Sequence, residues 1–393
     1  MPDAWFGVYD RLLVFDHDSG RATIISTGVD EAGQPNLDRA RRRAEEWQRK
    51  LTVKVVLPSS AQLLIPVGRG VPPSRSGRIG ETGARLGGTP RPTSLAHFEG
   101  APALESNLTR EEYEHAIRRI LDYIAAGDVY QINFSQRFRA RTVAGPEMLY
   151  HALRTANPAP FAAYLDCGVG QVLSSSPERF LQIRGRSIQT RPIKGTRPRT
   201  GNEQADQKAA RELMMSAKDQ AELLMITDLE RNDLGRVCEF GSVHVPELVT
   251  LESYATVLHL VSTVEGRLAD GVTAVDAIRA CFPGGSITGA PKIRAMEIID
   301  ELEPSARGVY TGAIGYLGFN GVADFNIAIR TMVYQDGAVH FHAGGGIVAD
   351  SEPALEYEET LHKARGMVQA LARAEAMAAE SGGVNTASRR SQG

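Results

Sequence analysis

The segment SSSPERFLQIRGRSIQTRPIKGTRPR, from Ser174 to Arg199, has two short alternating stretches on either side of an Arg-Gly-Arg turn. Residues 181–183 and 188–190 alternate apolar and polar side chains, which is typical of strands, and the glycine between them favours a hairpin. A hairpin returns the chain to the end where it began, so Glu178 and Lys194 are expected at the same end of one antiparallel sheet. Two interpretations are open: a surface ion pair, or two groups that react together.

Strands and helices also mix on either side of this hairpin. A capping box at Thr109–Glu112 predicts a helix start, because each end residue can satisfy the other's free amide, and residues 128–138 alternate as a strand. A long helix is predicted from Asn202 to about Asp228, ended by residues 231–233, and a last helix from about Pro353 to Ala378. Because strands far outnumber possible crossover helices, the sequence predicts an α+β fold built on antiparallel sheets.

The composition is that of an ordinary globular protein. The 393 residues are 42% hydrophobic and 23% charged, with a net charge of -3, so nothing indicates nucleic acid as a partner. No apolar run approaches the ~18 residues of a membrane helix, and the start, MPDAW, does not resemble a secretory signal. Cys167, Cys238 and Cys281 suggest neither a disulfide framework nor a zinc site, so we expect a cytoplasmic protein without membrane contact.

Two predicted helices each offer a pair of carboxylates. Asp219 and Glu222 are three residues apart on the first, and Glu356 and Glu359 on the last, so each pair shares a helix face. If the two faces met, their oxygens would suit Mg²⁺. The alternative is two solvated faces, with Glu359 and Lys363 forming an exposed ion pair.

Three further segments have two interpretations each. The loop CFPGGSITGAPK, residues 281–292, is not a P-loop, because Ala290 stands where a P-loop has its lysine. The loop either offers backbone amides to an anion or forms a tight turn before a helix. The glycines 344–346 allow a ligand close to the backbone, or mark a bulge. Arg330, on a predicted strand, binds an acidic ligand or a structural carboxylate. His259 and Tyr310 alone indicate packing.

The order of these segments resembles the chorismate-binding enzymes over residues 107–370. The matching blocks are SPERF, PIKGTRPR, AKDQAELLMITDLERNDLGRV, HLVSTVEGRL, FPGGSITGAPK, RGVYTGAIGY, IAIRT, AGGGIVADSEP and EYEETLHKA. The resemblance implies a sandwich of large antiparallel β-sheets with helices outside, chorismate as substrate and Mg²⁺ as cofactor. It also divides the chain into a partial N-terminal subdomain with a Gly/Pro-rich loop (1–106), a chorismate-binding catalytic domain (107–375) and a disordered tail (376–393).

The resemblance assigns roles to the residues above. It implies Glu222 and Glu359 as Mg²⁺ ligands, helped by Asp219 and Glu356. The residues it implies for substrate binding are Gln131, Thr196, His259, Ser286, Tyr310, Arg330, Gly344, Gly345, Gly346 and Lys363. Arg330, Lys363 and the glycine amides would hold carboxylates, and Tyr310 would lie beside the enolpyruvyl arm.

Two positions separate the members of this family. In this family, the isochorismate and salicylate synthases carry a lysine base at the position that resembles Gln131 of this chain. Because the lysine is missing here, the resemblance does not imply those two activities. Anthranilate synthases have a segment similar to PIAGT, with alanine at the position of Lys194. The lysine in this chain resembles the one that marks aminodeoxychorismate synthases. The resemblance therefore implies that Lys194 attacks ring C2, with Glu178 as general acid/base, and that ammonia gives 4-amino-4-deoxychorismate for p-aminobenzoate and folate synthesis.

The resemblance also implies a separate glutamine amidotransferase that supplies ammonia, since Cys167 does not stand in an amidotransferase motif. The first residues are similar to a segment well inside the family's N-terminal subdomain, so a shortened N-terminal part is expected. Two alternatives stay open: formation of anthranilate, and an inactive truncated paralogue that only binds the amidotransferase.

Overall fold

The computed structural model describes residues 11–16, 21–26, 36–52, 91–92, 101–254 and 257–390. The chain divides into two compact units, residues 2–75 and residues 76–393. The smaller unit contains the hairpin of β1 (Arg11–Asp16) and β2 (Arg21–Ser26) and the helix α1 (Leu37–Thr52). The Gly/Pro-rich loop expected within residues 68–92 lies outside the described residues, except for 91–92.

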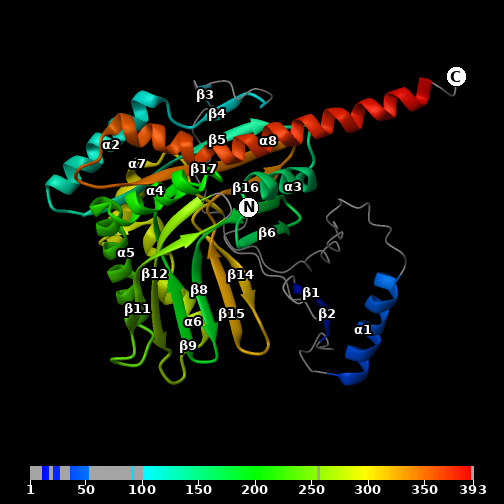
Figure 1. The fold of residues 1–393 in the computed structure, drawn as a ribbon, viewed down its shortest axis with the longest axis horizontal. Coiled ribbons are helices and arrows are strands. Elements are labelled where there is room, and N and C mark those ends of the chain that lie inside the picture. The colour runs from blue at the N-terminus through cyan, green and yellow to red at the C-terminus, as the bar shows by residue number, and fades with distance from the viewer. Residues whose placement is uncertain are drawn as a thin grey trace, which may run out of the picture. The chain divides into compact units, whose positions relative to one another are not determined.

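An eight-stranded sheet forms one half of the larger unit. Its strands, in spatial order, are β3 (Arg91–Pro92), β4 (Leu104–Ser106), β5 (Gln131–Arg141), β17 (Ala338–Ile347), β16 (Thr331–Gln335), β7 (Gln171–Ser176) and β6 (Phe161–Asp166), with β13 (Gly289–Ala290) paired to β5. Helices α2 (Arg110–Ala125), α3 (Pro146–Ala156) and α8 (Pro353–Arg390) lie on it, and α8 runs along β17 (Figure 1). Buried apolar side chains such as Phe134, Phe138 and Phe341 fill the interface.

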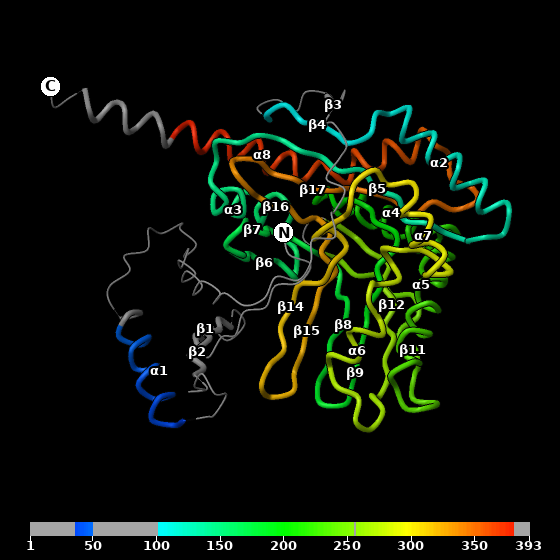
Figure 2. Tube along the Cα trace, turned by 180° about the vertical axis from the view of Figure 1, so that it is seen from behind, coloured from blue at the N-terminus to red at the C-terminus, as the bar shows by residue number. Residues whose placement is uncertain are grey.

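A seven-stranded sheet forms the other half. Its spatial order is β10 (Ile193–Pro198), β12 (Val257–Arg267), β9 (Ser187–Arg191), β8 (Arg179–Arg184), β15 (Val322–Ile327) and β14 (Ala313–Leu317), with β11 (His244–Ser253) paired to β12. Helices α4 (Glu203–Met214), α5 (Ala217–Gly235) and α6 (Ala274–Cys281) accompany this sheet, and Figure 2 shows its long strands side by side. The helix α7 (Lys292–Leu302) follows the short 3-10 turn at Gly285–Ile287.

The predicted fold class is confirmed, because all strand pairs among the described residues are antiparallel. The predicted hairpin is β8–β9, closed at Gly185, whose φ of 61° is in the left-handed region that glycine adopts without strain. The predicted capping box is present: Thr109 accepts from the Glu112 amide, and the Glu112 side chain accepts from the Thr109 amide.

Several predicted boundaries differ from the structure. The long helix predicted from Asn202 is two helices, because the Ser216 hydroxyl caps a new start by accepting from the Asp219 amide, and the second helix continues to Gly235. Helix α8 extends to Arg390, into the tail that was expected to be disordered. The helix formers Ala and Glu explain this extension through residues 376–380, whereas the helix propensity of residues 381–390, which include Gly382 and Gly383, does not explain it. The division at residue 107 stays a prediction; β3 and β4, which precede this residue, extend the sheet beyond β5.

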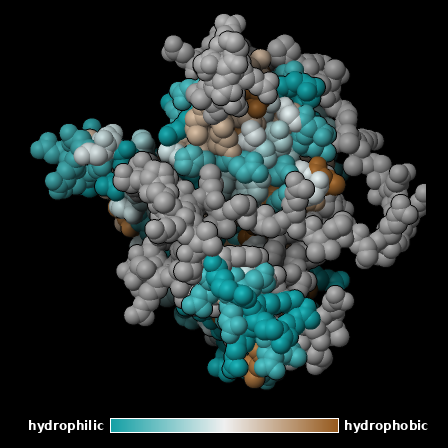
Figure 3. All heavy atoms as spheres, turned by 90° about the vertical axis from the view of Figure 1, so that its right-hand side faces the viewer, coloured by the Kyte–Doolittle hydropathy of each residue, from teal (hydrophilic) through white to brown (hydrophobic). Residues whose placement is uncertain are grey.

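Within the described residues, no helix is both long enough and apolar enough to cross a membrane. Figure 3 shows one face of the molecule, on which the coloured surface is mostly hydrophilic and apolar residues occupy small separate patches. Both observations agree with the composition of the chain.

Candidate active site

The β8–β9 hairpin brings Glu178 and Lys194 together. Glu178 directly precedes β8, and Lys194 is the second residue of β10, which follows β9 after one residue. A bulge at Gly195, with φ of 70°, interrupts the β10–β12 pairing and redirects the chain next to the lysine. Each of the two charged groups shifts the pKa of the other, so they lie within electrostatic reach, as predicted.

The environment of Glu178 favours the protonated acid. Its side chain is 5% exposed, and its Oε1 atom has no hydrogen-bond partner among the described residues. Burial raises the pKa of the carboxyl, while the Ser286 hydroxyl and the Lys194 ammonium oppose that shift only in part. A carboxyl with a raised pKa can hold a proton and deliver it to a leaving group.

The environment of Lys194 favours the neutral amine. Burial lowers the pKa of Lys194, although the side chain is partly accessible, and the positive charge of Lys363 lowers it further. The carboxylates of Glu222, Glu178 and Glu359 oppose this change. Because the net pKa is below its usual value, a larger neutral fraction is available to act as a nucleophile.

The two predicted carboxylate pairs face this region from different helices. The charge of Glu359 on α8 raises the pKa of Glu222 on α5, and the charge of Lys194 lowers the pKa of both carboxyls. Asp219 differs, because its carboxylate accepts from Arg197 at 2.9 Å. We therefore find Glu222 and Glu359 together, with Asp219 already in an ion pair.

The α8 carboxylates lie against the glycine-rich part of β17. A Cβ atom on Gly345 would lie 3.1 Å from Glu356 Oε2 and 3.2 Å from Glu359 Oε1, so two oxygens meet above this glycine. Glu356 Oε1 accepts from Ser351 at 2.6 Å, whereas its buried Oε2 has no partner within the described part of the chain. Glycines 344–346 lie inside β17, where close contacts with helix α8 and strand β5 leave no room for side chains.

These carboxylates have the chemistry that a hard cation prefers. Glu356 Oε2 is an acceptor without a donor, and a Glu359 oxygen faces the same glycine, which fits an ion that takes carboxylate oxygens. The side chains therefore fit Mg²⁺ by the type of ligand atom that they offer. Their arrangement is not that of a preformed site, because among the described residues no group of three or more Asp, Glu, His or Cys side chains is placed to hold a metal ion.

Lys363 connects the glycine strand to the carboxylates. Its ammonium donates to the Gly344 carbonyl at 3.0 Å and pairs with Glu359 at 2.6 Å. Burial raises the pKa of Glu359, but the Lys363 ammonium, together with the charges of Lys218 and Lys194, outweighs burial and leaves the pKa below its usual range. The predicted i,i+4 pair is thus present, at one edge of the candidate site.

Arg330 lies between two strands, not within one as predicted. It follows the end of β15 and directly precedes β16, and its φ of 48° is in the left-handed region, which is costly for a residue with a side chain. Its guanidinium forms no hydrogen bond or ion pair with the described residues. Burial lowers its pKa, and Glu178 only partly offsets this effect. A half-buried cation without a bonded partner favours the interpretation of an acidic ligand over a structural salt bridge.

The other predicted pocket residues line the same region. His259 Nδ1 lies 2.9 Å from Thr196 Oγ1, its Nε2 has no partner among described residues, and burial lowers its pKa to about 4. The Tyr310 ring stacks on His342 at 4.9 Å, and burial raises the pKa of Tyr310 to about 12. His259 is therefore a neutral ring with a nitrogen free for a ligand.

Gln131 and Ser286 are also buried with unused polar atoms. Both amide atoms of Gln131 and the hydroxyl of Ser286 lack partners among the described residues. A Cβ on Gly346 would lie 3.0 Å from the Gln131 nitrogen, so this amide packs on the glycine strand. Buried polar groups without partners are costly, which indicates that a ligand or water completes their bonding.

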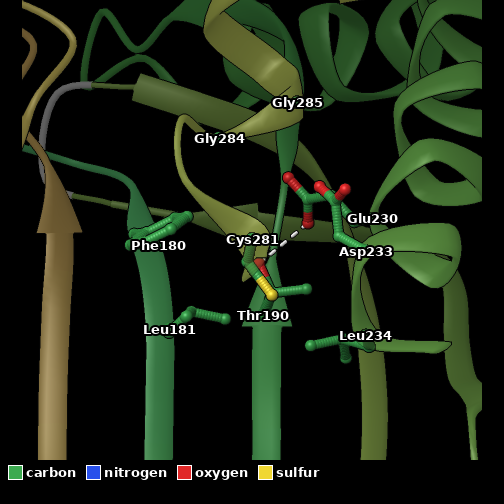
Figure 4. A pocket seen from close by; sticks show the side chains of 9 residues that line it. All are labelled: Phe180, Leu181, Thr190, Glu230, Asp233, Leu234, Cys281, Gly284 and Gly285. Carbon is green, nitrogen blue, oxygen red and sulfur yellow. Dashed lines mark hydrogen bonds between the residues drawn. The ribbon is translucent and has the colours of Figure 1, made fainter. Parts of the chain in front are cut away.

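Sequence reasoning missed a buried group behind this site. Figure 4 shows Glu230 and Asp233 of α5 beside Thr190 and Cys281. These residues line a cavity of about 10 Å³, roughly the space that one water needs. Thr190 donates to Glu230 at 2.8 Å, and burial raises the pKa of Glu230 to about 8. The glutamate stands within the block DLERNDLG, but its polar neighbours gave no sign that it turns inward.

Glu230→Gln is expected to change how stability depends on pH. In the folded protein Glu230 keeps its proton up to about pH 8, whereas in the unfolded chain it ionises near 4.5, so wild-type stability falls across this range, by about 1.4 kcal/mol per pH unit at most. The glutamine variant lacks this loss and should gain free energy of unfolding over the wild type between pH 5 and pH 8. Urea unfolding at both pH values measures it; an equal difference at both would contradict a buried acid.

The chain is similar to known enzymes along most of its length. A family model described as chorismate binding enzyme matches residues 1–369. Anthranilate synthase component 1 of Pseudomonas aeruginosa is 43% identical over 374 residues, which cover 95% of this chain and 70% of that protein. Aminodeoxychorismate synthase component 1 of Salmonella typhimurium is 51% identical over 274 residues, which cover 70% of this chain and 60% of that protein.

A solved structure supports the fold. The crystal structure of anthranilate synthase component I from Streptococcus pneumoniae TIGR4 matches with a TM-score of 0.72 and 31% identity, over 92% of this chain and 72% of that one. Relatives with two different product names are thus similar to the same chain, and the similarity alone does not distinguish the two reactions.

Proposed function

Because the chain belongs to the chorismate-binding enzyme family, we propose that it converts chorismate and ammonia to 4-amino-4-deoxychorismate. The observation that carries this proposal is Lys194, a lysine with a lowered pKa that is within electrostatic reach of the protonatable Glu178 and of Glu222 and Glu359. An exposed ion pair would contribute only ~0–1 kcal/mol and would not require burial. The same lysine is the residue that favours amination at C4 over anthranilate formation.

The substrate carries two carboxylates, and the candidate site holds cations for them. Arg330 has no bonded partner among described residues, and Lys363 lies beside the Gly344–Gly346 strand, so they are proposed to bind the carboxylates of chorismate. Tyr310 is proposed to lie beside the enolpyruvyl arm. The ring pocket is proposed to be lined by the polar atoms without partners on Gln131, His259 and Ser286 among the described residues. Thr196, which lies beside the other ring nitrogen of His259, is proposed to belong to the same pocket.

Mg²⁺ is proposed to be held by Glu222 and Glu359, with Glu356 and Asp219 nearby. When bound, such an ion neutralises and orients a substrate carboxylate. Glu356 would contribute its Oε2 atom, which accepts no hydrogen bond from the described residues. Asp219 would support the ion from nearby while it keeps its hydrogen bond with Arg197.

The proposed reaction proceeds through the lysine. The Lys194 nitrogen forms a bond to ring C2, the ring double bonds shift, and the C4–O bond breaks, with Glu178 giving its proton so that water leaves. Ammonia then bonds to C4, the double bonds shift back, the C2–N bond breaks and Lys194 is restored. The net change is loss of hydroxyl and gain of an amine at C4, and the enolpyruvyl ether is retained.

Ammonia is proposed to come from a separate glutamine amidotransferase. The relatives are named component 1, which implies a second component in those proteins. Co-purification of this chain with a glutaminase, together with glutamine-dependent turnover, would test this pairing.

Gly345→Ala is expected to weaken Mg²⁺ binding. The new Cβ would stand 3.1 Å and 3.2 Å from oxygens of Glu356 and Glu359 and force them apart. Changes of this kind typically cost about 10- to 100-fold in metal affinity. The measurement is the Mg²⁺ dependence of turnover and of the melting temperature. Gly235→Ala is the matched control, because a Cβ there meets nothing within 4 Å; equal Mg²⁺ dependence in both variants would argue against the proposed ligands.

Product identification tests the proposed function. Purified protein would be incubated with chorismate, Mg²⁺ and ammonium salt at mildly alkaline pH, and the products analysed by mass and fluorescence. An aminated product that keeps its enolpyruvyl group is expected. Fluorescent anthranilate would support the reaction named for the Pseudomonas relative instead. Chorismate binding without any product would support the inactive paralogue.

A further inference from the structure

Lys292 fastens the loop that carries Ser286. Its ammonium donates to the Pro283 carbonyl at 2.7 Å and the Cys281 carbonyl at 3.1 Å, and it pairs with Asp233 Oδ2 at 2.5 Å. All three of its N–H donors can thus be used within the protein. Because the carbonyls belong to the start of the segment 281–292 and the lysine to its end, these bonds close the segment on itself and tie it to α5.

The closed segment packs tightly against strand β15 and helix α5. A Cβ on Gly284 would lie 2.9 Å from Ile327, and one on Gly285 would lie 2.8 Å from Leu229. Figure 4 shows these two glycines close to Glu230 and Asp233. Ile327, against which Gly284 packs, donates its amide to the Glu178 carbonyl at 3.0 Å, so the segment lies next to the start of β8. Ser286 comes next in the chain after Gly285 and is 5% exposed, and its hydroxyl and the Glu178 Oε1 atom are both buried without a hydrogen-bond partner among the described residues. In agreement with this proximity, the Ser286 hydroxyl lowers the pKa of Glu178. A shift of the segment would therefore move Ser286 relative to Glu178.

We propose that Lys292 and Asp233 are positioning residues for the reaction, which act by holding the 281–292 segment so that the Ser286 hydroxyl faces Glu178. This inference rests on the proposed function, because it assigns the reason for the geometry of the same site. Neither residue touches the proposed substrate; both act through Ser286.

The burial of the pair supports a role beyond stability. The side chains of Lys292 and Asp233 are 13% and 7% exposed, and taking both charges out of water costs free energy that well-packed apolar residues would not require. An apolar pair, however, could not donate hydrogen bonds to the Cys281 and Pro283 carbonyls at the start of the segment. The directional hydrogen bonds of the Lys292 ammonium therefore fix the position of the 281–292 segment relative to α5.

Kinetics of Lys292→Met, alone and with Ser286→Ala, test the inference. Because small misplacements of catalytic groups cost up to about 10²-fold, Lys292→Met is expected to lower kcat by about 10- to 100-fold while KM for chorismate changes by less than about threefold. In the Ser286→Ala background the same change should cost little more, because both act through one group. Asp233→Asn, which keeps the side-chain size, should give a smaller effect in the same direction.

The matched control is Glu375→Gln, which weakens a carboxylate that accepts from Thr142 and Val143 and that lies in none of the proposed roles. It should lower stability without changing kcat. Equal losses from Lys292→Met in both Ser286 backgrounds would overturn the inference.

Hydrogen–deuterium exchange separates this inference from the proposed function. Amides of residues 284–288 should exchange faster in Lys292→Met than in wild type or in Glu375→Gln. If the wild type turns over no chorismate, the proposed function fails, yet exchange still decides whether Lys292 holds the segment. Unchanged exchange in folded Lys292→Met or Asp233→Asn would overturn the inference in either case.

Discussion

Lys194→Ala is expected to reduce the amination of chorismate by on the order of 10⁴-fold or more, as removal of a covalent nucleophile does in other enzymes. Burial lowers the pKa of Lys194, which favours the neutral nucleophile, and alanine has no group that can bond to C2. Chorismate should still bind, because Arg330 and Lys363 remain. The measurements are kcat with ammonium as nitrogen donor and the dissociation constant for chorismate.

Lys208→Ala is the matched control for this loss. Lys208 is exposed on α4 and forms an i,i+4 pair with Glu212 at 3.7 Å. Its removal should leave kcat and the dissociation constant for chorismate unchanged. Retention of most of the activity in Lys194→Ala would show that the lysine is not the nucleophile, and that the site aminates chorismate directly.

Glu178→Gln is expected to lower kcat by about 10²- to 10⁴-fold, the range for loss of a general acid. Glutamine keeps the size of the side chain and cannot release a proton to the leaving hydroxyl. Because burial raises the pKa of Glu178, the wild-type carboxyl carries its proton to higher pH than an exposed glutamate does. The activity that depends on the protonated form should therefore decline at high pH in the wild type, and this decline should be absent from the variant.

A pH profile of kcat compares the two proteins directly. Glu297→Gln, on the exposed face of α7 and paired with Arg294 at 3.0 Å, is the control and should reproduce the wild-type profile. An unchanged rate in Glu178→Gln would assign the proton to another group, and the buried carboxyl would then have a structural role.

The sequence predicted the parts of the site that depend on periodic patterns. The Arg-Gly-Arg turn predicted the β8–β9 hairpin and thereby the proximity of Glu178 and Lys194. Helical spacing predicted that Glu356 and Glu359 share one face, and both meet Gly345. The roles of these residues, in contrast, came from the family resemblance, since an i,i+3 pair of carboxylates is common on solvated helices.

Other features depend on tertiary contacts that no short pattern encodes. Arg330 looked like a strand residue because apolar neighbours surround it, but the chain crosses there from one sheet to the other in a left-handed conformation. The glycines 344–346 indicated either a bulge or the close approach of a ligand, and the sequence did not show that they lie inside β17, where α8 and β5 pack closely on them. Burial of Glu230 depends on α5 packing against Thr190, which is remote in sequence.

The central claim is that Lys194 bonds covalently to the ring of chorismate. The direct measurement is the peptide mass around Lys194 after incubation with chorismate and Mg²⁺ in the absence of ammonia. We predict a mass increase equal to chorismate less one water, located on Lys194. An unmodified Lys194 peptide, in protein that aminates chorismate as soon as ammonia is added, would contradict the account.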